Sequence, residues 1–375
     1  CNLRHELPLL HQRLFKAGKR GAKIFAVNPI DFESSFAWAG QRIVAPSRLA
    51  NELDAIASGA DDDARAIADA LRAANGNAVV ILGEIAENGV HASRIRAAAA
   101  SLAQAVGARL NRIPQGANAV GLAALGVLPG ASGRNAGEMF AGGLDACVLF
   151  GIEPQYDFAD ATSALKALGA ARVVAFAAYA PESLRRVADV ILPIGLLPEI
   201  DGTLTNLDGI TQATAAAGKL PGEAKSGWRV LRAFGESLAL AGFDFTDLAG
   251  LRASASERAV PVRARAAGRV PAGEGLERIA TTPIYRGDAV LRRAPALNRH
   301  PLTLGARIAL HPDDAKALGL ADGALAKVGD GAGTATLPVA ITARVARGTA
   351  WIETGYDATA PISARVALGV ARASA

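Results

Sequence analysis

The residues best suited to chemistry lie in a short polar loop, Glu199–Gln212. Two glycines of this loop, Gly202 and Gly209, permit a positive φ or a close backbone approach. The loop follows the apolar run at 190–192, and open α/β sheets hold ligands at the ends of their strands. Uncharged hydrogen-bonding groups and acidic acceptors make up most of the remaining polar side chains: Thr203, Thr205, Asn206 and Gln212; Glu199, Asp201 and Asp208.

Such a loop has two interpretations. Its side chains either contact a ligand that has many donors and acceptors, or they satisfy the loop's own backbone through Asx and Ser/Thr turns. From these residues alone the structural interpretation is favoured, because one polar loop is a weak indication of a ligand.

Other catalytic and metal-binding patterns are absent from the sequence. Cys1 and Cys147 are isolated, whereas an iron–sulfur cluster needs about four thiolates, or two thiolates and two histidines, at compact spacing. The five histidines form no HExxH or Cys/His pattern. The glycines of 130–137 do not follow the G-x-G-x-x-G spacing, and Gly18-Lys19 lacks the frame of a P-loop. The sequence therefore nominates no catalytic residue and no metal ligand.

Length and composition limit the class of protein. A chain of 375 residues, 51% of them hydrophobic, has room for two domains and a large core. No stretch supplies about 20 uninterrupted, strongly apolar residues, so we expect no transmembrane helix. The chain begins with Cys1 and without a signal-peptide pattern, so we expect a fragment of a longer polypeptide. Two cysteines form no disulfide framework and fit a reducing compartment.

Helical and strand patterns alternate through the first two-thirds of the chain. Near-continuous apolar strands separated by helices indicate a parallel sheet covered on both faces. Residues 1–250 are therefore expected to form a doubly wound α/β region. The expected strands are 23–27, 78–82, 108–111, 146–150, 172–176 and 190–192, and the expected helices include one from Pro8, one closed by Gly107, and 62–74, 118–125, 135–141, 161–168 and 182–187.

The last third of the chain changes character. Residues 251–297 hold four prolines and many arginines, which indicates a linker on the surface. The arginines lack interleaved aromatic residues and are diluted by acids, so nucleic-acid binding is not expected. A capped helix and turn are expected at His311–Gly323, followed by strands at 324–328, 334–341 and 349–352 with a hairpin loop at 329–333. Residues 298–375 are therefore expected to form a small β-barrel domain.

Three successive motifs resemble the molybdopterin oxidoreductase superfamily. They read ADVILP at 188–193, E-x-D-G-T-x-x-N-x-D-G-x-x-Q at 199–212 and P-G-x-A-x-x-x-W at 221–228. The forms LDG and TQA within them are most similar to the large iron–sulfur subunit of bacterial NADH-quinone oxidoreductase, which is respiratory complex I. The segment His311–Gly323 resembles the helix and turn of the superfamily's C-terminal dinucleotide-binding barrel. The resemblance covers nearly the whole sequence.

The resemblance implies that the loop keeps vestigial pterin-loop positions at Glu199, Gly202, Thr203, Asn206 and Asp208. It implies a C-terminal scaffold region that supports electron transfer from NADH to quinone through iron–sulfur clusters elsewhere in the full-length subunit. No cofactor is expected within these 375 residues. The implied partners are other subunits of the complex I peripheral arm, on the cytoplasmic face of the cell membrane and without insertion into it.

Two alternatives stay open. The first is a true molybdopterin enzyme, such as a formate dehydrogenase-like oxidoreductase, that holds molybdopterin guanine dinucleotide. The second is a redox-inert interaction module. The turn Cys1-Asn2-Leu3 stands where cofactor-binding members have a G-x-N-P-type turn facing a phosphate. Leu3 replaces the usual proline, and an ordinary strand-to-helix turn explains these residues at least as well.

Overall fold

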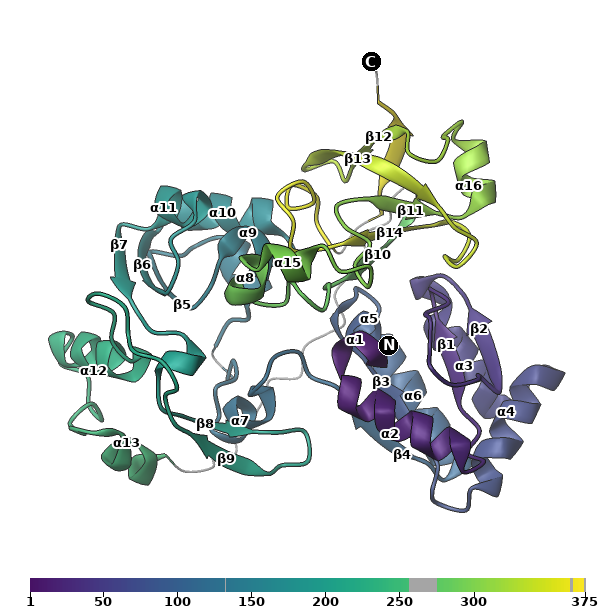
Figure 1. The fold of residues 1–375 in the computed structure, drawn as a ribbon, viewed down its shortest axis with the longest axis horizontal. Coiled ribbons are helices and arrows are strands. Elements are labelled where there is room, and N and C mark those ends of the chain that lie inside the picture. Colours follow the sequence, from purple (N-terminus) through teal and green to yellow (C-terminus); the bar gives the residue numbers. More distant parts are fainter. Residues whose placement is uncertain (132, 256–274, 365–366, 374–375) are drawn as a thin grey trace. The chain divides into compact units, whose positions relative to one another are not determined.

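The computed structural model describes residues 1–131, 133–255, 275–364 and 367–373 (Figure 1). The chain forms two compact units. Residues 1–114 and 266–375 belong to the first unit, and residues 115–265 form the second. The chain thus leaves the first unit after Pro114 and later returns to it. The expected division into domains 1–250, 251–297 and 298–375 stays a prediction.

The N-terminal part of the first unit alternates helices with short parallel strands. Strand β1 pairs with β2 and β3 pairs with β4, both in parallel. Pro8 occupies the first turn of α2, as expected from its fixed φ. The elements are α1 (Leu3–Glu6), α2 (Pro8–Lys19), β1 (Phe25–Asn28), β2 (Gly40–Ile43), η1 (Pro46–Arg48), α3 (Leu49–Ser58), α4 (Asp62–Ala73), β3 (Val79–Leu82), α5 (Glu84–Asn88), α6 (Ala92–Val106) and β4 (Arg109–Arg112).

Helix α6 shows how the sequence pattern builds this core. Ile95, Leu102 and Val106 recur at helical spacing, and all three side chains are buried. Gly107 then ends the helix in the left-handed region with a φ of 67°. These residues pack with the buried side of α3, which includes Ile56. The strands and helices expected between 8 and 112 are confirmed, whereas β2 was not predicted.

The second unit contains a parallel sheet and a hairpin. The sheet order is β5-β6-β7, and Leu149 of β5 packs on one face with Leu168 of α10 and Leu184 of α11. Asn135 caps α8 through a reciprocal capping box with Glu138. The elements are α7 (Ala119–Ala124), α8 (Ala136–Phe140), β5 (Ala146–Phe150), α9 (Pro154–Asp157), α10 (Ala161–Gly169), β6 (Arg172–Ala177), α11 (Glu182–Val187), β7 (Val190–Pro193), η2 (Leu197–Glu199), β8 (Gly202–Thr205), β9 (Thr211–Thr214), α12 (Gly227–Ser237) and α13 (Leu248–Ser254).

A curled six-stranded sheet dominates the C-terminal part of the first unit. Its order is β10-β14-β11-β13-β12-β15. Leu276 and Leu368, which precede the two end strands, form an isolated antiparallel bridge. A closed barrel stays a prediction. The elements are β10 (Glu277–Thr281), α14 (Ala289–Arg292), α15 (Pro295–Asn298), β11 (Ile308–Leu310), α16 (Pro312–Ala317), β12 (Leu325–Gly329), β13 (Thr334–Ile341), β14 (Thr349–Glu353) and β15 (Gly369–Arg372).

The expectation of a surface linker at 251–297 is wrong for β10. This strand pairs in parallel with β14, and Ile279 is only 1% exposed. The buried guanidinium of Arg278 donates hydrogen bonds to the carbonyls of Ile362 and Ser363, which allows a charged side chain inside the sheet. Residues 256–274 of the expected linker lie outside the described residues.

The fold class is therefore mixed α/β with parallel sheets, while the doubly wound topology stays a prediction. Within the described ranges, no helix is both long and apolar enough to cross a membrane.

Candidate functional site

The polar loop folds into a β-hairpin. Strands β8 and β9 pair in antiparallel, with Gly202 opposite Thr214 and Thr205 opposite Thr211. The hydroxyl groups of Thr205 and Thr211 lie 2.9 Å apart and share a hydrogen bond. The period-two alternation that marks longer strands is too short to be visible in four residues, so the sequence indicated only a loop here.

Asn206 and Gly209 shape the turn between the two strands. The side-chain oxygen of Asn206 accepts hydrogen bonds of 2.9 Å from the backbone N–H groups of both Asp208 and Ile210. The backbone N–H of Gly209 donates to the carbonyl of Asn206 at 3.0 Å. Gly209 has a φ of 77°, a conformation that favours glycine. Asn206 therefore holds an Asx-type turn, and its side-chain oxygen serves the chain's own backbone.

The start of the loop is held in the same way. Glu199 ends the short helix η2, and its carboxylate accepts a hydrogen bond of 2.8 Å from the backbone N–H of Leu196. Asp201 accepts one of 2.9 Å from the N–H of Ala216, beyond the hairpin. Both acidic side chains therefore fix the path of the chain on either side of the hairpin.

Helix α13 contacts the hairpin at β8. The Arg252 guanidinium donates hydrogen bonds to the Thr203 hydroxyl at 3.0 Å and to the Gly202 carbonyl at 2.8 Å. Gly202 has no positive φ, and a Cβ atom placed on it would lie 3.2 Å from the Thr214 hydroxyl. The close approach expected for Gly202 is therefore present, and the positive φ is confined to Gly209.

Helix α7 contacts the other end of β8. The side-chain oxygen of Asn118 accepts a 2.8 Å hydrogen bond from the backbone N–H of Thr205. A Cβ atom on Gly121 would lie 3.0 Å from the Thr205 hydroxyl, so a glycine lets the helix approach the strand. Sequence reasoning missed Asn118 and Arg252, because each lies far from the loop in the sequence and no motif marks it.

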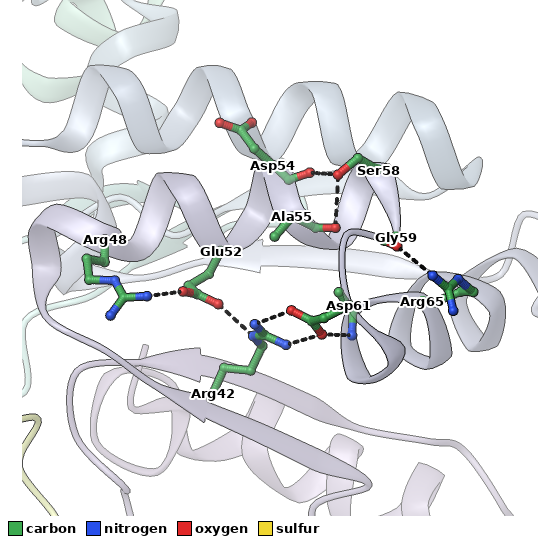
Figure 2. Close-up of polar contacts among 10 residues, drawn as sticks. Arg42, Arg48, Glu52, Asp54, Ala55, Ser58, Gly59, Asp61 and Arg65 are labelled. Atoms are coloured by element: carbon green, nitrogen blue, oxygen red, sulfur yellow. Dashed lines mark hydrogen bonds and ion pairs between the residues drawn. The ribbon is translucent and has the colours of Figure 1, made fainter.

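A second polar cluster lies in the first unit, on β2, α3 and α4 (Figure 2). The Arg42 guanidinium bonds to Glu52 at 2.6 Å and to both carboxylate oxygens of Asp61 at 2.9 and 3.0 Å. Arg48 adds a bond to Glu52 at 3.2 Å. The hydrogen bond from Arg42, and then that from the N–H of Ala64, lower the pKa of Asp61 to about 2.

This cluster borders an open depression of about 440 Å³, which Asp62 and Asp63 also line. Since the two arginines are paired with carboxylates inside the cluster, the arrangement ties three elements together and offers no unpaired cation to a ligand. Among the residues that the structure describes, no three His, Cys, Asp or Glu side chains are grouped closely enough to hold a metal ion.

Residues 1–237 match the sequence model of the molybdopterin oxidoreductase family, and residues 280–371 match the Molydopterin dinucleotide binding domain. The chain therefore belongs to the molybdopterin oxidoreductase family, an oxidoreductase family with this mixed α/β fold.

Within that family the chain is similar to subunits of NADH-quinone oxidoreductase. It is 26% identical to one such subunit of Mycobacterium bovis over 90% of its own length and 45% of that protein. It is 34% identical to subunit 3 of Thermus thermophilus over 43% of its length and 19% of that protein. The chain thus spans less than half the length of these curated relatives. Acetylene hydratase from Pelobacter acetylenicus shares the fold, with a TM-score of 0.57 and 13% identity over 94% of this chain and 69% of that one.

The family raises the question of whether the hairpin fits a pterin. Glu199, Thr203 and Asn206 already bond within the chain. The Thr214 hydroxyl is buried without a hydrogen-bond partner in the described structure, but Gly202 approaches it closely. The carboxylates of the loop would also repel an anionic phosphate. The hairpin therefore does not by itself fit a pterin, and no chemical step is derived through that group.

Proposed function

We propose that this chain is the C-terminal scaffold region of the large iron–sulfur subunit of an NADH-quinone oxidoreductase. In this role it supports electron transfer from NADH to quinone through iron–sulfur clusters held by residues outside the chain. The observation that carries the proposal is the similarity to the Mycobacterium bovis subunit over 90% of the chain. A hairpin whose side chains hold its own backbone supports it, because that is the behaviour of a structural element.

The same proposal assigns the partners and the location. The chain would assemble with other subunits of the complex I peripheral arm at the cytoplasmic face of the cell membrane, without entering the membrane and without nucleic acid. Glu199, Gly202, Thr203, Asn206 and Asp208 would be vestigial pterin-loop positions that now stabilise the fold. The C-terminal sheet would be a barrel of the dinucleotide-binding type, an assignment that the Leu276–Leu368 bridge supports.

The test compares two substitutions in the same turn within the complete subunit. Asn206→Ala removes the acceptor of two backbone hydrogen bonds, whereas Asp208→Asn changes the charge of a pterin-loop position and keeps the turn. We expect Asn206→Ala to lower the amount of assembled complex, with unchanged NADH–quinone activity per assembled complex. Asp208→Asn should leave both quantities unchanged. Loss of activity per assembled complex in Asp208→Asn would contradict the scaffold role.

A true molybdopterin enzyme is the second candidate, because residues 280–371 match a dinucleotide-binding domain. Metal analysis of the full-length protein separates the two: iron without molybdenum or tungsten supports the scaffold, and molybdenum or tungsten near one atom per chain supports the enzyme. The 375-residue chain alone should be colourless. If it proves to be neither an enzyme nor a part of the complex, a redox-inert interaction module is the remaining interpretation.

A further inference from the structure

The sheet β5-β6-β7 has one face that is only partly covered. Along β5, Leu149 packs into the core below the sheet, whereas Val148 and Phe150 on the opposite face are 47% and 46% exposed. The register places Val148, Val174 and Val190 in one row across this face. Parallel sheets are usually covered on both faces, so exposed valines in such a row are unexpected.

Helix α12 covers only the next row of the same face. The Phe176 ring, which is fully buried, lies 5.6 Å from the ring of Phe234. Gly227, at the start of α12, approaches Phe150 so closely that a Cβ atom on it would lie 2.5 Å from the ring. The row of Val148 and Val190 remains exposed on both sides of β6.

The two edges of this sheet differ in their protection. At the β7 edge, Pro193 has no N–H to offer, Ile194 bridges to Lys225, and the N–H of Gly195 donates to the Lys225 carbonyl at 2.9 Å. Strand β5 pairs only with β6 among the described residues. Its sequence, ACVLF, contains no proline and no charge, the devices that usually block pairing at an edge.

We propose that β5 pairs with β5 of a second copy of this chain, in antiparallel, about a two-fold axis at Val148. The three-stranded sheet would then continue through the axis into its copy. This inference is independent of the proposed function.

The strand itself favours a second copy as the occupant. Pairing about Val148 sets Ala146 opposite Phe150 of the second copy, a small side chain beside a large one, on the exposed face. On the other face Cys147 lies opposite Leu149 of the second copy. A two-fold axis brings identical residues together, so a charge there would repel its own copy. The run 146–151 is uncharged, and Asp145 would lie opposite Gly151.

The test is the mass of the purified 375-residue chain in solution as its concentration is raised. We expect a monomer–dimer equilibrium. Val148→Lys should weaken dimerisation by more than about tenfold, because two lysines would meet at the axis. Val190→Lys is the matched control, since Val190 has the same 47% exposure in the same row at the protected edge, and it should leave the dimer intact.

Cross-linking gives a second measurement that does not depend on how the lysine variant folds. In a Cys147→Ser background, Val148→Cys should yield a covalent dimer on oxidation, because the two substituted positions meet at the axis. A monomer at every concentration, a dimer that persists in Val148→Lys, equal loss in Val190→Lys, or a dimer without the cross-link would each overturn the proposal. So would a β5 edge protected from amide exchange only by a different protein.

Discussion

Glu84, the first residue of α5, has an acidity set by its surroundings. Its carboxylate accepts a 2.8 Å hydrogen bond from the backbone N–H of Thr282, and the Glu6 carboxylate accepts one of 2.7 Å from the N–H of Glu84. Burial, and to a lesser extent the negative charge of Glu6, raise the pKa of Glu84 to about 7, against the effect of the bond from Thr282. This carboxyl group therefore titrates near neutral pH in the folded chain.

The raised pKa predicts how stability depends on pH at this residue. Because the folded-state pKa lies above the ordinary value of 4.5, the stabilising contribution is complete below about pH 4.5 and is lost as the pH rises through about 7. Glu84→Gln keeps the shape but cannot ionise. Relative to the wild type, it should therefore gain up to about 2–3 kcal/mol of unfolding free energy between pH 5 and pH 8.

Urea unfolding of both proteins at the two pH values measures this difference. The control is Glu182→Gln, whose parent side chain is 70% exposed beside Arg186 and should show the wild-type pH dependence. Parallel pH curves for the wild type and Glu84→Gln would show that the ionised carboxylate is tolerated at this position.

Residue types in the hairpin could be predicted from sequence, but their partners could not. The composition of the loop indicated Asx and Ser/Thr turns, and Asn206 forms one. Which distant residues would hold the hairpin depends on the tertiary fold. Asn118 lies 87 residues before its partner Thr205, and Arg252 lies 49 residues after Thr203. Neither contact leaves a local pattern in the sequence.

At the scale of elements, the hairpin depends on one glycine more than on the other. Gly209 has a φ of 77°, so Gly209→Ala should lower the unfolding free energy by about 1–2 kcal/mol through backbone strain. Gly202→Ala should cost less, because only the Thr214 hydroxyl at 3.2 Å must move. Gly169 in α10, with no atom near its added Cβ and no positive φ, is a matched control for alanine substitution. Thermal unfolding of the three variants measures the order, and equal costs at 209 and 202 would contradict it.

Strand β2 shows why some elements escape prediction. The four residues GQRI carry no alternation that a core would impose, and three of them are half-buried. Arg42 on β2 instead reaches Glu52 on α3 and the cap of α4 at Asp61, as Figure 2 shows. The strand is thus fixed by ionic contacts between elements, which a local sequence pattern does not contain.

Arg42→Met should destabilise the first unit by about 2–4 kcal/mol. The substitution leaves Glu52, whose side chain is only 7% exposed, with Arg48 as its remaining cationic partner in the described structure and frees Asp61 from its bidentate bond. Arg65→Met breaks a pair whose side chains are 57% and 99% exposed, and it should cost about 0–0.5 kcal/mol. Urea unfolding of the two variants tests the contrast. Similar losses would mean that the Arg42 cluster is no more costly to break than a surface pair.

At the scale of the whole molecule, the sequence anticipated the mixed α/β class but not how the chain is divided. Alternating apolar strands and helices were recovered because their periodicity is local, as in α6 and β13. The return of the chain after residue 265 to the unit that it left at Pro114 has no local pattern. Strand β10 was missed for a related reason: its neighbours are rich in arginine and proline, and its burial depends on β14, which lies about 70 residues later.

The position of β10 predicts where a stable C-terminal fragment must begin. Strand β14 lies between β10 and β11, and the five-residue register with β10 buries Ile279 to 1% exposure. A fragment of residues 298–375, the domain expected from sequence, lacks β10 and leaves β14 as an open, apolar edge. A fragment of residues 275–375 keeps that edge paired and retains the core around Leu337 and Ile352. We expect the longer fragment to unfold cooperatively and to exceed the shorter one in stability by at least about 2 kcal/mol, the value of burying one isoleucine. The shorter fragment should aggregate or bind a hydrophobic dye. Equal melting of two soluble fragments would place the boundary near residue 298 and reduce β10 to an accessory strand.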